Sequence, residues 1–479
     1  DACEDFVLAV EICEDLWTAM PPSVNHALAG ATIIANISAS NEVIAKDEYR
    51  EMLVKSQSAK LYCGYIYSDA GYGESTTDLV FAGDNMIAEN GTILARSKRF
   101  NNECVYTELD LERLVGERKK SNTYNIVGSE KYVSVKLDMN IGDTKITRYV
   151  DKQPFVPSDD KKREKRSEEI LSIQSLGLKK RLDHTHAKTA VVGVSGGLDS
   201  TLALLVTVRA FDSLNIDRKN IIAVTMPCFG TTDRTYNNAV NFANSLGVTL
   251  KEVNIKAAVN QHFADIEHDP NVYDVTYENS QARERTQILM DVANKSGGLV
   301  IGTGDMSELA LGWATYNGDH MSMYGVNAGV PKTLIRYLVD YEAKRTNNDI
   351  LKKTLQDILD TPVSPELLPP KDGKISQKTE HIVGPYELHD FFLYHLMRFG
   401  SKPSKILRLA EVAFDGIYDR EVILEWLKVF YRRFFAQQFK RSCLPDGPKV
   451  GSVALSPRGD WRMPSDASYQ IWAKELETL

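Results

Sequence analysis

The chain has 479 residues, of which 57 are Lys or Arg and 65 are Asp or Glu, giving a formal net charge of −8. With 43% hydrophobic and 25% charged residues, it has the composition of an ordinary globular protein, which excludes the fibrous and disordered classes. A net negative surface repels nucleic-acid backbone and anionic lipid, so we expect small-molecule partners, no nucleic acid and no membrane.

Two features of the sequence concern location and covalent chemistry. No apolar run approaches the roughly 18 residues of a membrane helix, and acids stand where a signal peptide has its basic region. We therefore expect a cytoplasmic protein. The six cysteines form no CxxC pair, so each is expected to be a free thiol. The strand-like residues 6–12 begin without a polar lead-in, and we expect the chain to be the C-terminal part of a longer protein.

Residues 1–150 are predicted to form a layered α/β unit. Short apolar strands are expected at 6–12, 31–38 and 61–68, and a hairpin at 78–97 turns at Asn90-Gly91. A helix is expected at 42–58, and weaker strands and turns at 115–150. Residues 151–188 combine prolines with a dense charge run, which indicates a linker followed by the first helices of a second domain.

From residue 189 to 479 the pattern predicts a second domain with a helical C-terminal tail. Strands at 190–194, 221–227, 248–255 and 298–304 alternate with helices that begin near 199, 233, 280 and 307. This alternation is typical of a doubly wound parallel sheet in an α/β protein, whose ligands bind at the carboxyl ends of the strands.

The strongest motif is the loop of residues 193–200, GVSGGLDS, which lies between a buried strand and a helix. Its small residues let the backbone approach an anion, and the helix directs unpaired N–H groups at it. Asp199 stands where a GxxxxGK[ST] loop has its Lys, and a carboxylate suits Mg²⁺ bridging a pyrophosphate. A ligand-free turn is the disfavoured alternative. Gly302-Thr-Gly304 begins a dinucleotide fingerprint, but Ser307 replaces the third Gly, which excludes NAD as a redox cofactor.

The SGGxDS loop resembles the ATP-pyrophosphatase superfamily. Together with residues 226–239, 278–290, 302–339, 364–370, 383–394 and 440–451, it resembles the glutamine-dependent NAD⁺ synthetase family over nearly the whole chain. The resemblance implies that the nicotinate carboxylate of deamido-NAD⁺ attacks the α-phosphate of ATP, releasing pyrophosphate and forming an acyl-adenylate. Ammonia then displaces AMP to give NAD⁺, so ATP is a substrate and NAD⁺ the product.

The resemblance also implies the binding residues. ATP is held at Gly193, Val194, Ser195, Gly196, Gly197, Leu198, Asp199, Ser200 and Thr303. Deamido-NAD⁺ is held at Asn279, Glu308, Trp313, Ala314, Thr315, Tyr316 and Lys440. Asp199 and Glu308 are the expected Mg²⁺ ligands, and Lys332 and Arg283 are further candidates beside the phosphates. Without the motifs, Glu308 would be read as a solvated first-turn acid, and Trp313 and Tyr316 as core aromatics.

Residues 1–110 resemble the nitrilase-like glutaminase half of the family, through residues 10–17, 36–46 and 71–81. The resemblance implies that Cys13 is the nucleophile and that glutamine is held by Ser40, Lys46 and Trp17. In the family a Glu base and a Lys precede the Cys. Residues 1–12 contain no Lys and lack the family's Glu context, so we expect this chain to use ammonium salts and not glutamine.

Two alternatives remain open from the residues themselves. One is another ATP-pyrophosphatase amidotransferase, acting on a nucleotide base or on aspartate. The other is a nucleotide-binding sensor without chemistry, which Asp199 and Glu308 disfavour. Product analysis with deamido-NAD⁺ and measurement of pyrophosphate release separate the three. A homo-oligomer is the expected assembly.

Overall fold

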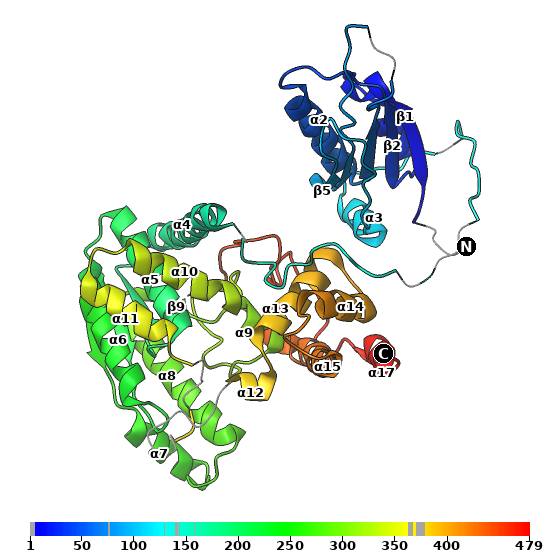
Figure 1. Cartoon of the computed structure of the whole chain (residues 1–479). Helices are drawn as coiled ribbons and strands as arrows, with labels where there is room; N and C mark the ends of the chain where they lie inside the picture. The colour runs from blue at the N-terminus through cyan, green and yellow to red at the C-terminus, as the bar shows by residue number, and fades with distance from the viewer. Residues whose placement is uncertain are drawn as a thin grey trace. The chain divides into compact units, whose positions relative to one another are not determined.

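A computed structural model describes residues 5–479 except 75–76, 129, 139–141, 143, 158, 363–366 and 370–378. Of the motif at 364–370, only residues 367–369 are therefore described. The chain forms two compact units, Asp1–Val150 and Asp151–Leu479 (Figure 1). None of the described helices has the length and apolar character needed to span a bilayer.

The first unit is built on a five-stranded sheet with the order β1-β2-β3-β4-β5. Strands β1 (Leu8–Ile12), β2 (Ile33–Ser38) and β3 (Gly64–Asp69) are parallel, and β4 (Met86–Glu89) and β5 (Thr92–Arg96) are antiparallel. Asn90 and Gly91, with φ of 46° and 83°, make the expected hairpin turn. Helices α1 (Pro22–Leu28) and α2 (Lys46–Leu61) contribute to the core on one face.

The other face of this sheet is apolar and exposed along β1 and at the end of β2. Side chains that alternate along the two strands are 43–66% exposed, namely Leu8, Val10, Ile12 and Ile37. The weak strands expected at 115–150 are absent from the described residues of that stretch. Helix α3 (Leu111–Lys120) begins before it, capped by Asp110, whose side chain accepts from the Arg113 N–H.

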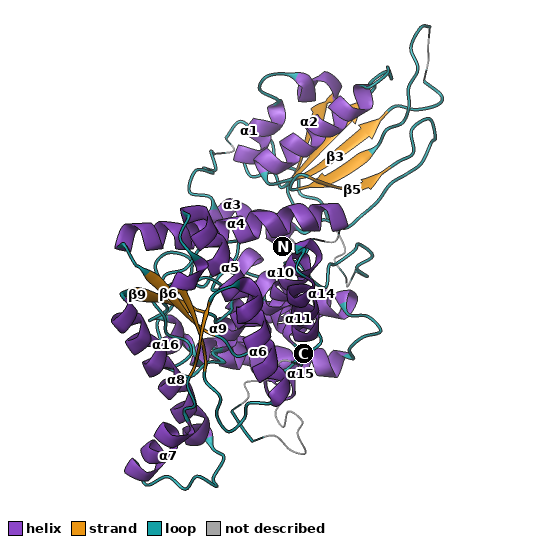
Figure 2. Cartoon of the chain, turned by 90° about the vertical axis from the view of Figure 1, so that its left-hand side faces the viewer, coloured by secondary structure: helices purple, strands orange, loops and turns teal. Residues whose placement is uncertain are grey.

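The second unit contains a parallel sheet with the order β10-β9-β6-β7-β8. Figure 2 shows its neighbouring strands β9 and β6. Its strands are β6 (Thr189–Gly193), β7 (Ile221–Thr225), β8 (Thr249–Glu252), β9 (Gly298–Gly302) and β10 (Tyr324–Gly325). Val192 faces the core made with α5, α6, α10 and α11, while its neighbour Val191 faces the core beneath α8. Both faces of the sheet are therefore covered, as in a doubly wound fold.

The helices around this sheet are α4 (Asp160–Thr185), α5 (Leu198–Leu214), α6 (Asp233–Leu246), α7 (Lys256–Asp265), α8 (Val275–Ser296), α9 (Met306–Leu311), α10 (Lys332–Arg345) and α11 (Asp349–Leu359). The stretch 151–188, expected as a linker and first helices, contains the 26-residue helix α4, which packs on α5.

The C-terminal part is helical, as the sequence predicts. It consists of α12 (Thr379–Val383), α13 (Tyr386–Tyr394) with a π-turn at His395–Phe399, α14 (Pro403–Ala413), α15 (Arg420–Ala436), α16 (Gln438–Arg441) and α17 (Gln470–Glu477). Buried aromatic rings, among them Phe392, Phe430 and Phe434, fill the space between α13 and α15. Helices α13 and α15 also pack on the short helix α9, which lies at the edge of the site described next.

Candidate active site

The loop at 193–200 joins β6 to α5 with its backbone held close to the start of α6. Gly196 has φ of +84°, and a Cβ there would lie 2.2 Å from the Thr235 carbonyl oxygen, so only glycine fits. The Ser195 and Ser200 hydroxyls are 3.2 Å apart. Helix α5 begins after Gly197 without a side-chain cap, which leaves its first N–H groups available to an anion.

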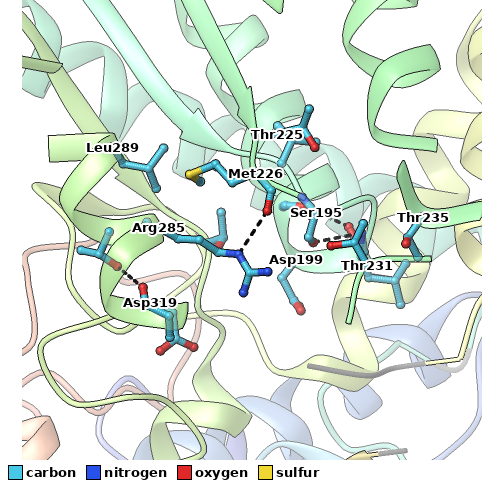
Figure 3. A pocket seen from close by; sticks show the side chains of 18 of the residues that line it. Ser195, Asp199, Thr225, Met226, Thr231, Thr235, Arg285, Leu289 and Asp319 are labelled. Carbon is cyan, nitrogen blue, oxygen red and sulfur yellow. Dashed lines mark hydrogen bonds between the residues drawn. The ribbon is translucent and has the colours of Figure 1, made fainter. Parts of the chain in front are cut away.

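A cavity of about 290 Å³ opens beside this loop. It is bounded by the loop, by the residues after β7 and by Thr303 after β9, and Figure 3 shows Ser195, Asp199, Met226 and Arg285 around it. Strands β6, β7 and β9 end here with β6 in the middle, so the cavity lies where the winding of the sheet reverses direction. Its wall combines charged groups with the apolar side chains of Met226 and Leu289, a mixture that suits a nucleotide.

Three carboxylates meet at one end of the cavity. Asp199, Asp305 and Glu308 each present an oxygen within 4.8 Å of the other two. The Lys332 Nζ lies among them, 2.7 Å from Asp199, 2.6 Å from Asp305 and 2.9 Å from Glu308. Because the Lys332 side chain is only 5% exposed, its ammonium is the internal counter-charge of the cluster.

Burial and proximity shift the protonation of this cluster. Burial raises the pKa of Glu308 to about 7 and that of Asp305 well above its usual range, although Lys332 opposes both shifts. Burial alone would lower the pKa of Lys332, but the three acids together hold it well above the usual value. Lys332 therefore stays charged here, while the pKa of Glu308 lies near neutral pH.

The cluster fits a divalent metal ion. Asp199 Oδ1 is buried and accepts no hydrogen bond within the described structure, while Asp305 Oδ2 contacts the Lys332 Nζ at 2.6 Å. Carboxylate oxygens are the donors that Mg²⁺ prefers. Asp305 was not predicted as a site residue from the sequence, although its place at the start of a helix could have indicated it. It is the N-cap of α9, and its Oδ1 accepts from the Glu308 N–H at 2.8 Å.

The far end of α9 is fixed by cations of the C-terminal helices. The Lys440 Nζ donates to the carbonyls of Gly312 and Ala314 at 2.8 and 2.6 Å. The Arg433 Nε donates to the Leu311 carbonyl at 3.0 Å, and its guanidinium stands 5.3 Å from the ring of Trp313. These donors satisfy carbonyls that a helix end leaves open.

Of the positions assigned to deamido-NAD⁺, only Glu308 and Trp313 line the cavity. Thr315 donates from its hydroxyl to the Asn279 Oδ1 at 2.8 Å, and Tyr316 stacks on His320 with 5.2 Å between ring centroids. Asn279, Ala314, Thr315, Tyr316 and Lys440 thus form a connected group next to the cavity wall.

The arginine expected near the phosphates is placed differently. Arg283 is exposed and its Nε donates to the Tyr316 carbonyl at 3.3 Å. Arg285, two residues further along α8, lines the cavity, with its Nε 3.4 Å from the Met226 carbonyl (Figure 3). Successive side chains of a helix are about 100° apart, so a two-residue shift moves the charge to another face.

In the first unit, Cys13 follows β1 directly and begins a 3₁₀ helix at Cys13–Trp17. Its φ of +48° is rare for a residue with a side chain, and such strain gathers at functional sites. Asn36 Nδ2 donates to the Cys13 carbonyl at 3.3 Å. The thiol itself is partly exposed.

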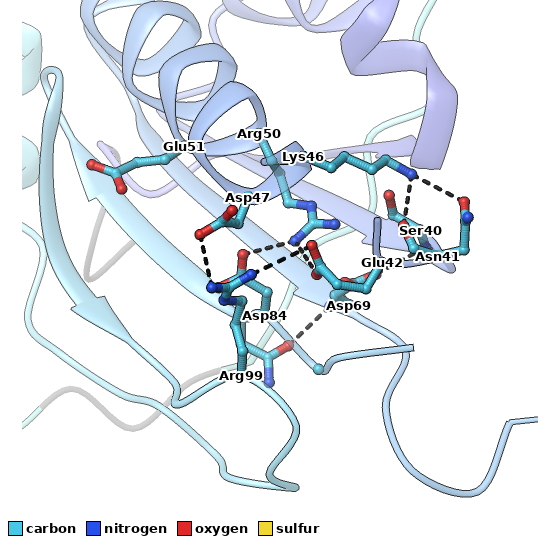
Figure 4. A network of polar contacts seen from close by, with 12 residues as sticks. Ser40, Asn41, Glu42, Lys46, Asp47, Arg50, Glu51, Asp69, Asp84 and Arg99 are labelled. Carbon is cyan, nitrogen blue, oxygen red and sulfur yellow. Dashed lines mark hydrogen bonds and ion pairs between the residues drawn. The ribbon is translucent and has the colours of Figure 1, made fainter. Parts of the chain in front are cut away.

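Trp17 and Lys46 come together in the same unit, with 5.5 Å between the Lys46 Nζ and the Trp17 ring. Figure 4 shows Lys46 reaching Asn41 and the neighbouring ion pairs of Arg50. The fully buried Arg50 contacts Glu42 at 3.2 Å and Asp84 at 2.7 Å. Ser40 is held through its N–H, which donates to the Asp69 Oδ1 at 2.9 Å. These contacts fix the loop between β2 and α2.

Similarity to known proteins identifies the family of this chain. A family model described as NAD synthase matches residues 170–417. A glutamine-dependent NAD(+) synthetase from Mycobacterium tuberculosis is 43% identical over 506 residues, covering 98% of this chain and 74% of the relative. The chain belongs to the glutamine-dependent NAD(+) synthetase family. The family resemblance expected from the motifs is thereby confirmed.

More distant members of the glutamine-dependent NAD(+) synthetase family agree. The protein so described from Aquifex aeolicus is 28% identical over 466 residues, covering 95% of this chain and 74% of its own length. The crystal structure of one from Cytophaga hutchinsonii superposes with a TM-score of 0.54 at 20% identity, covering 99% of this chain and 73% of that one. The likeness confirms the predicted α/β fold class.

Proposed function

We propose that the chain catalyses the ATP-dependent amidation of deamido-NAD⁺ to NAD⁺. The observation that supports it is that the phosphate loop and two carboxylates of the cluster, Asp199 and Glu308, line one cavity at the switch point of a parallel sheet. An oxygen of the nicotinate carboxylate attacks the α-phosphorus of ATP, and the bond to the bridging oxygen breaks. Pyrophosphate leaves into the loop, where the N–H groups at the start of α5 receive its charge. Ammonia then attacks the acyl carbon, and AMP departs.

Asp199 and Glu308, with Asp305 beside them, would hold Mg²⁺, which supplies positive charge opposite the phosphates. Lys332 is the chain's own cation at the same place, 2.7 Å from Asp199 and 2.9 Å from Glu308. Thr303 ends β9 on the cavity wall and is proposed to contact the adenylate. The group formed by Asn279, Thr315, Tyr316 and Lys440 is proposed to bind the dinucleotide beyond it.

For the nitrogen source we propose glutamine hydrolysis at Cys13 in an enzyme that also carries the family's Glu base and Lys, whereas this chain by itself is expected to use ammonium salts. The thiolate attacks the carboxamide carbon, ammonia leaves, and water cleaves the thioester to glutamate. Ser40, Lys46 and Trp17 are proposed to contact glutamine. In this proposal residues 1–150 are the C-terminal part of a nitrilase-like glutaminase domain, 151–188 are the linker and first helices, and 189–479 are the synthetase domain.

The test is ATP–pyrophosphate exchange in the presence of deamido-NAD⁺. The Asp199→Ala variant should lose exchange and keep its fold, because Lys332 retains Asp305 and Glu308 as partners. Asp212→Ala, at the exposed end of the same helix, is the matched control and should exchange at the wild-type rate. Exchange by the wild type with a nucleotide whose base has a ring carbonyl, or with aspartate, and none with deamido-NAD⁺, would favour the base- or aspartate-directed amidotransferase. No exchange with either would favour the sensor.

A further inference from the structure

The start of helix α10 lacks a cap of its own. Its N-cap is Pro331, which offers no side-chain acceptor to the first N–H groups. Other parts of the chain provide them. The Ser307 Oγ, from α9, accepts from the Lys332 N–H at 2.8 Å, and the Asp390 Oδ2, from α13, accepts from the Thr333 N–H at 3.0 Å. Two helices distant in sequence therefore determine where α10 begins.

Asp390 bonds to both helices at once. Its Oδ1 accepts from the Ser307 hydroxyl, and its Oδ2 accepts from the Thr333 hydroxyl at 2.7 Å as well as from the Thr333 N–H. The residue is 1% exposed, and within the described structure no cation forms an ion pair with it. Three donors and the positive end of the α10 dipole support its charge instead.

The residues that Asp390 holds are the immediate neighbours of the charged cluster. Ser307 precedes Glu308, and Thr333 follows Lys332. One turn earlier on the same face of α13, the ring of Tyr386 lies 5.3 Å from the Lys332 Nζ. Helix α13 thus contacts Lys332 at its ammonium and, through Ser307, at its backbone.

We propose that Asp390 is a positioning residue for adenylation, which fixes Lys332 and Glu308 relative to each other. The inference rests on the proposed function, since it assigns a purpose to a contact behind that site. Asp390 lies outside the cavity lining and acts through Ser307 and Thr333. A displacement of either neighbour would move the counter-charges of the cluster, and an error of about 1 Å in such groups costs up to about a hundredfold in rate.

A second helix cap in the same unit gives a matched control. Helix α14 also begins with a proline, Pro403, and has no side-chain cap of its own. Glu475 of α17 accepts from the Ser404 N–H at 2.9 Å and from its hydroxyl at 2.6 Å. Glu475 therefore caps a helix start in the way Asp390 does, but the residue that it holds, Ser404, is not next to any residue of the charged cluster.

The experiment compares Asp390→Asn with Glu475→Gln. Each amide replaces one acceptor oxygen with a donor, and both variants should melt at a lower temperature than the wild type. In ATP–pyrophosphate exchange with deamido-NAD⁺, Asp390→Asn should lower kcat by at least about tenfold while KM for ATP changes less than about threefold, since the groups displaced act on the reacting phosphate and not on the nucleoside. Glu475→Gln should keep the wild-type kcat.

Thr333 supplies a second, milder pair of variants. Thr333→Val removes one donor to Asp390 at nearly constant side-chain volume and should lower kcat, as Asp390→Asn does. Thr333→Ser keeps the hydroxyl and should have the wild-type kcat. The inference is overturned if Asp390→Asn and Thr333→Val exchange at the wild-type rate, or if Glu475→Gln loses kcat equally. Failure of the wild type to exchange with deamido-NAD⁺ would instead refute the proposed function.

Discussion

Replacing Lys332 with Met should destabilise the protein strongly at alkaline pH and much less at mildly acidic pH. The substitution keeps a linear side chain but removes the ammonium that contacts three acids at 2.6–2.9 Å. With all groups ionised, the cluster changes from one positive charge against three negative charges to three negative charges alone. Removing one member of a buried ion pair costs about 3–5 kcal/mol. Domains have total stabilities of about 5–15 kcal/mol, so the loss is a large share.

The pH dependence follows from the acids. Burial already raises the pKa of Glu308 to about 7, and loss of Lys332 removes an influence that lowers it. A carboxyl whose pKa is higher in the folded than in the unfolded protein adds stability at low pH, and that stability is lost as pH rises through the folded value. In the variant, Glu308 and Asp305 can take up protons below neutral pH and relieve their repulsion. The deficit relative to wild type should therefore shrink as pH falls from about 8 to about 6.

Urea unfolding of both proteins at the two pH values measures this deficit. Lys344→Met, on the same helix α10, is the control, because its ion pair with Asp340 is at the surface with Lys344 73% exposed. Such a pair is worth at most about 1 kcal/mol. A Lys332→Met deficit no larger than that of the control, or one that does not change with pH, would show that the ammonium is not the counter-charge we infer.

Two further predictions concern the loop and the thiol. Gly196→Ala should abolish ATP–pyrophosphate exchange and lower the free energy of unfolding by about 1–3 kcal/mol, because the new Cβ would lie 2.2 Å from the Thr235 carbonyl oxygen. Gly197→Ala should lower it less, since the nearest atom to its new Cβ is the Ser195 hydroxyl at 3.3 Å. Equal losses in the two variants would contradict the steric reasoning. Cys13→Ala should remove any glutamine-dependent NAD⁺ formation and leave ammonia-dependent formation unchanged. Replacement of the buried Cys63 by Ala is the control. If Cys13→Ala, but not Cys63→Ala, lowers the ammonia-dependent rate, the assignment of Cys13 to glutamine is contradicted.

The sequence predicts features that depend on neighbouring residues. Strands β6, β7 and β9 and the loop that follows β6 are visible as apolar runs next to small residues. Asp305 could have been found as an N-cap three residues before Glu308. The contact between Asp390 and Thr333 spans 57 residues, and no local pattern indicates it. Arg283 was predicted near the phosphates in place of Arg285 because both are arginines of the same helix. Only the packing of α8 determines which of the two faces the cavity.

The short helix α9 also determines how much of the chain the synthetase half needs. The NAD synthase family model ends at residue 417. The cations that bond the carbonyls at the end of α9 come later, from Arg433, Lys440 and Arg441. Further along, the Asp446 carbonyl accepts from the Gly325 N–H of β10 at 2.7 Å. An excised domain cut at 417 would leave these backbone groups without partners and Glu308 without its support. The smallest portion that can be expressed alone with an intact site must therefore extend beyond residue 446.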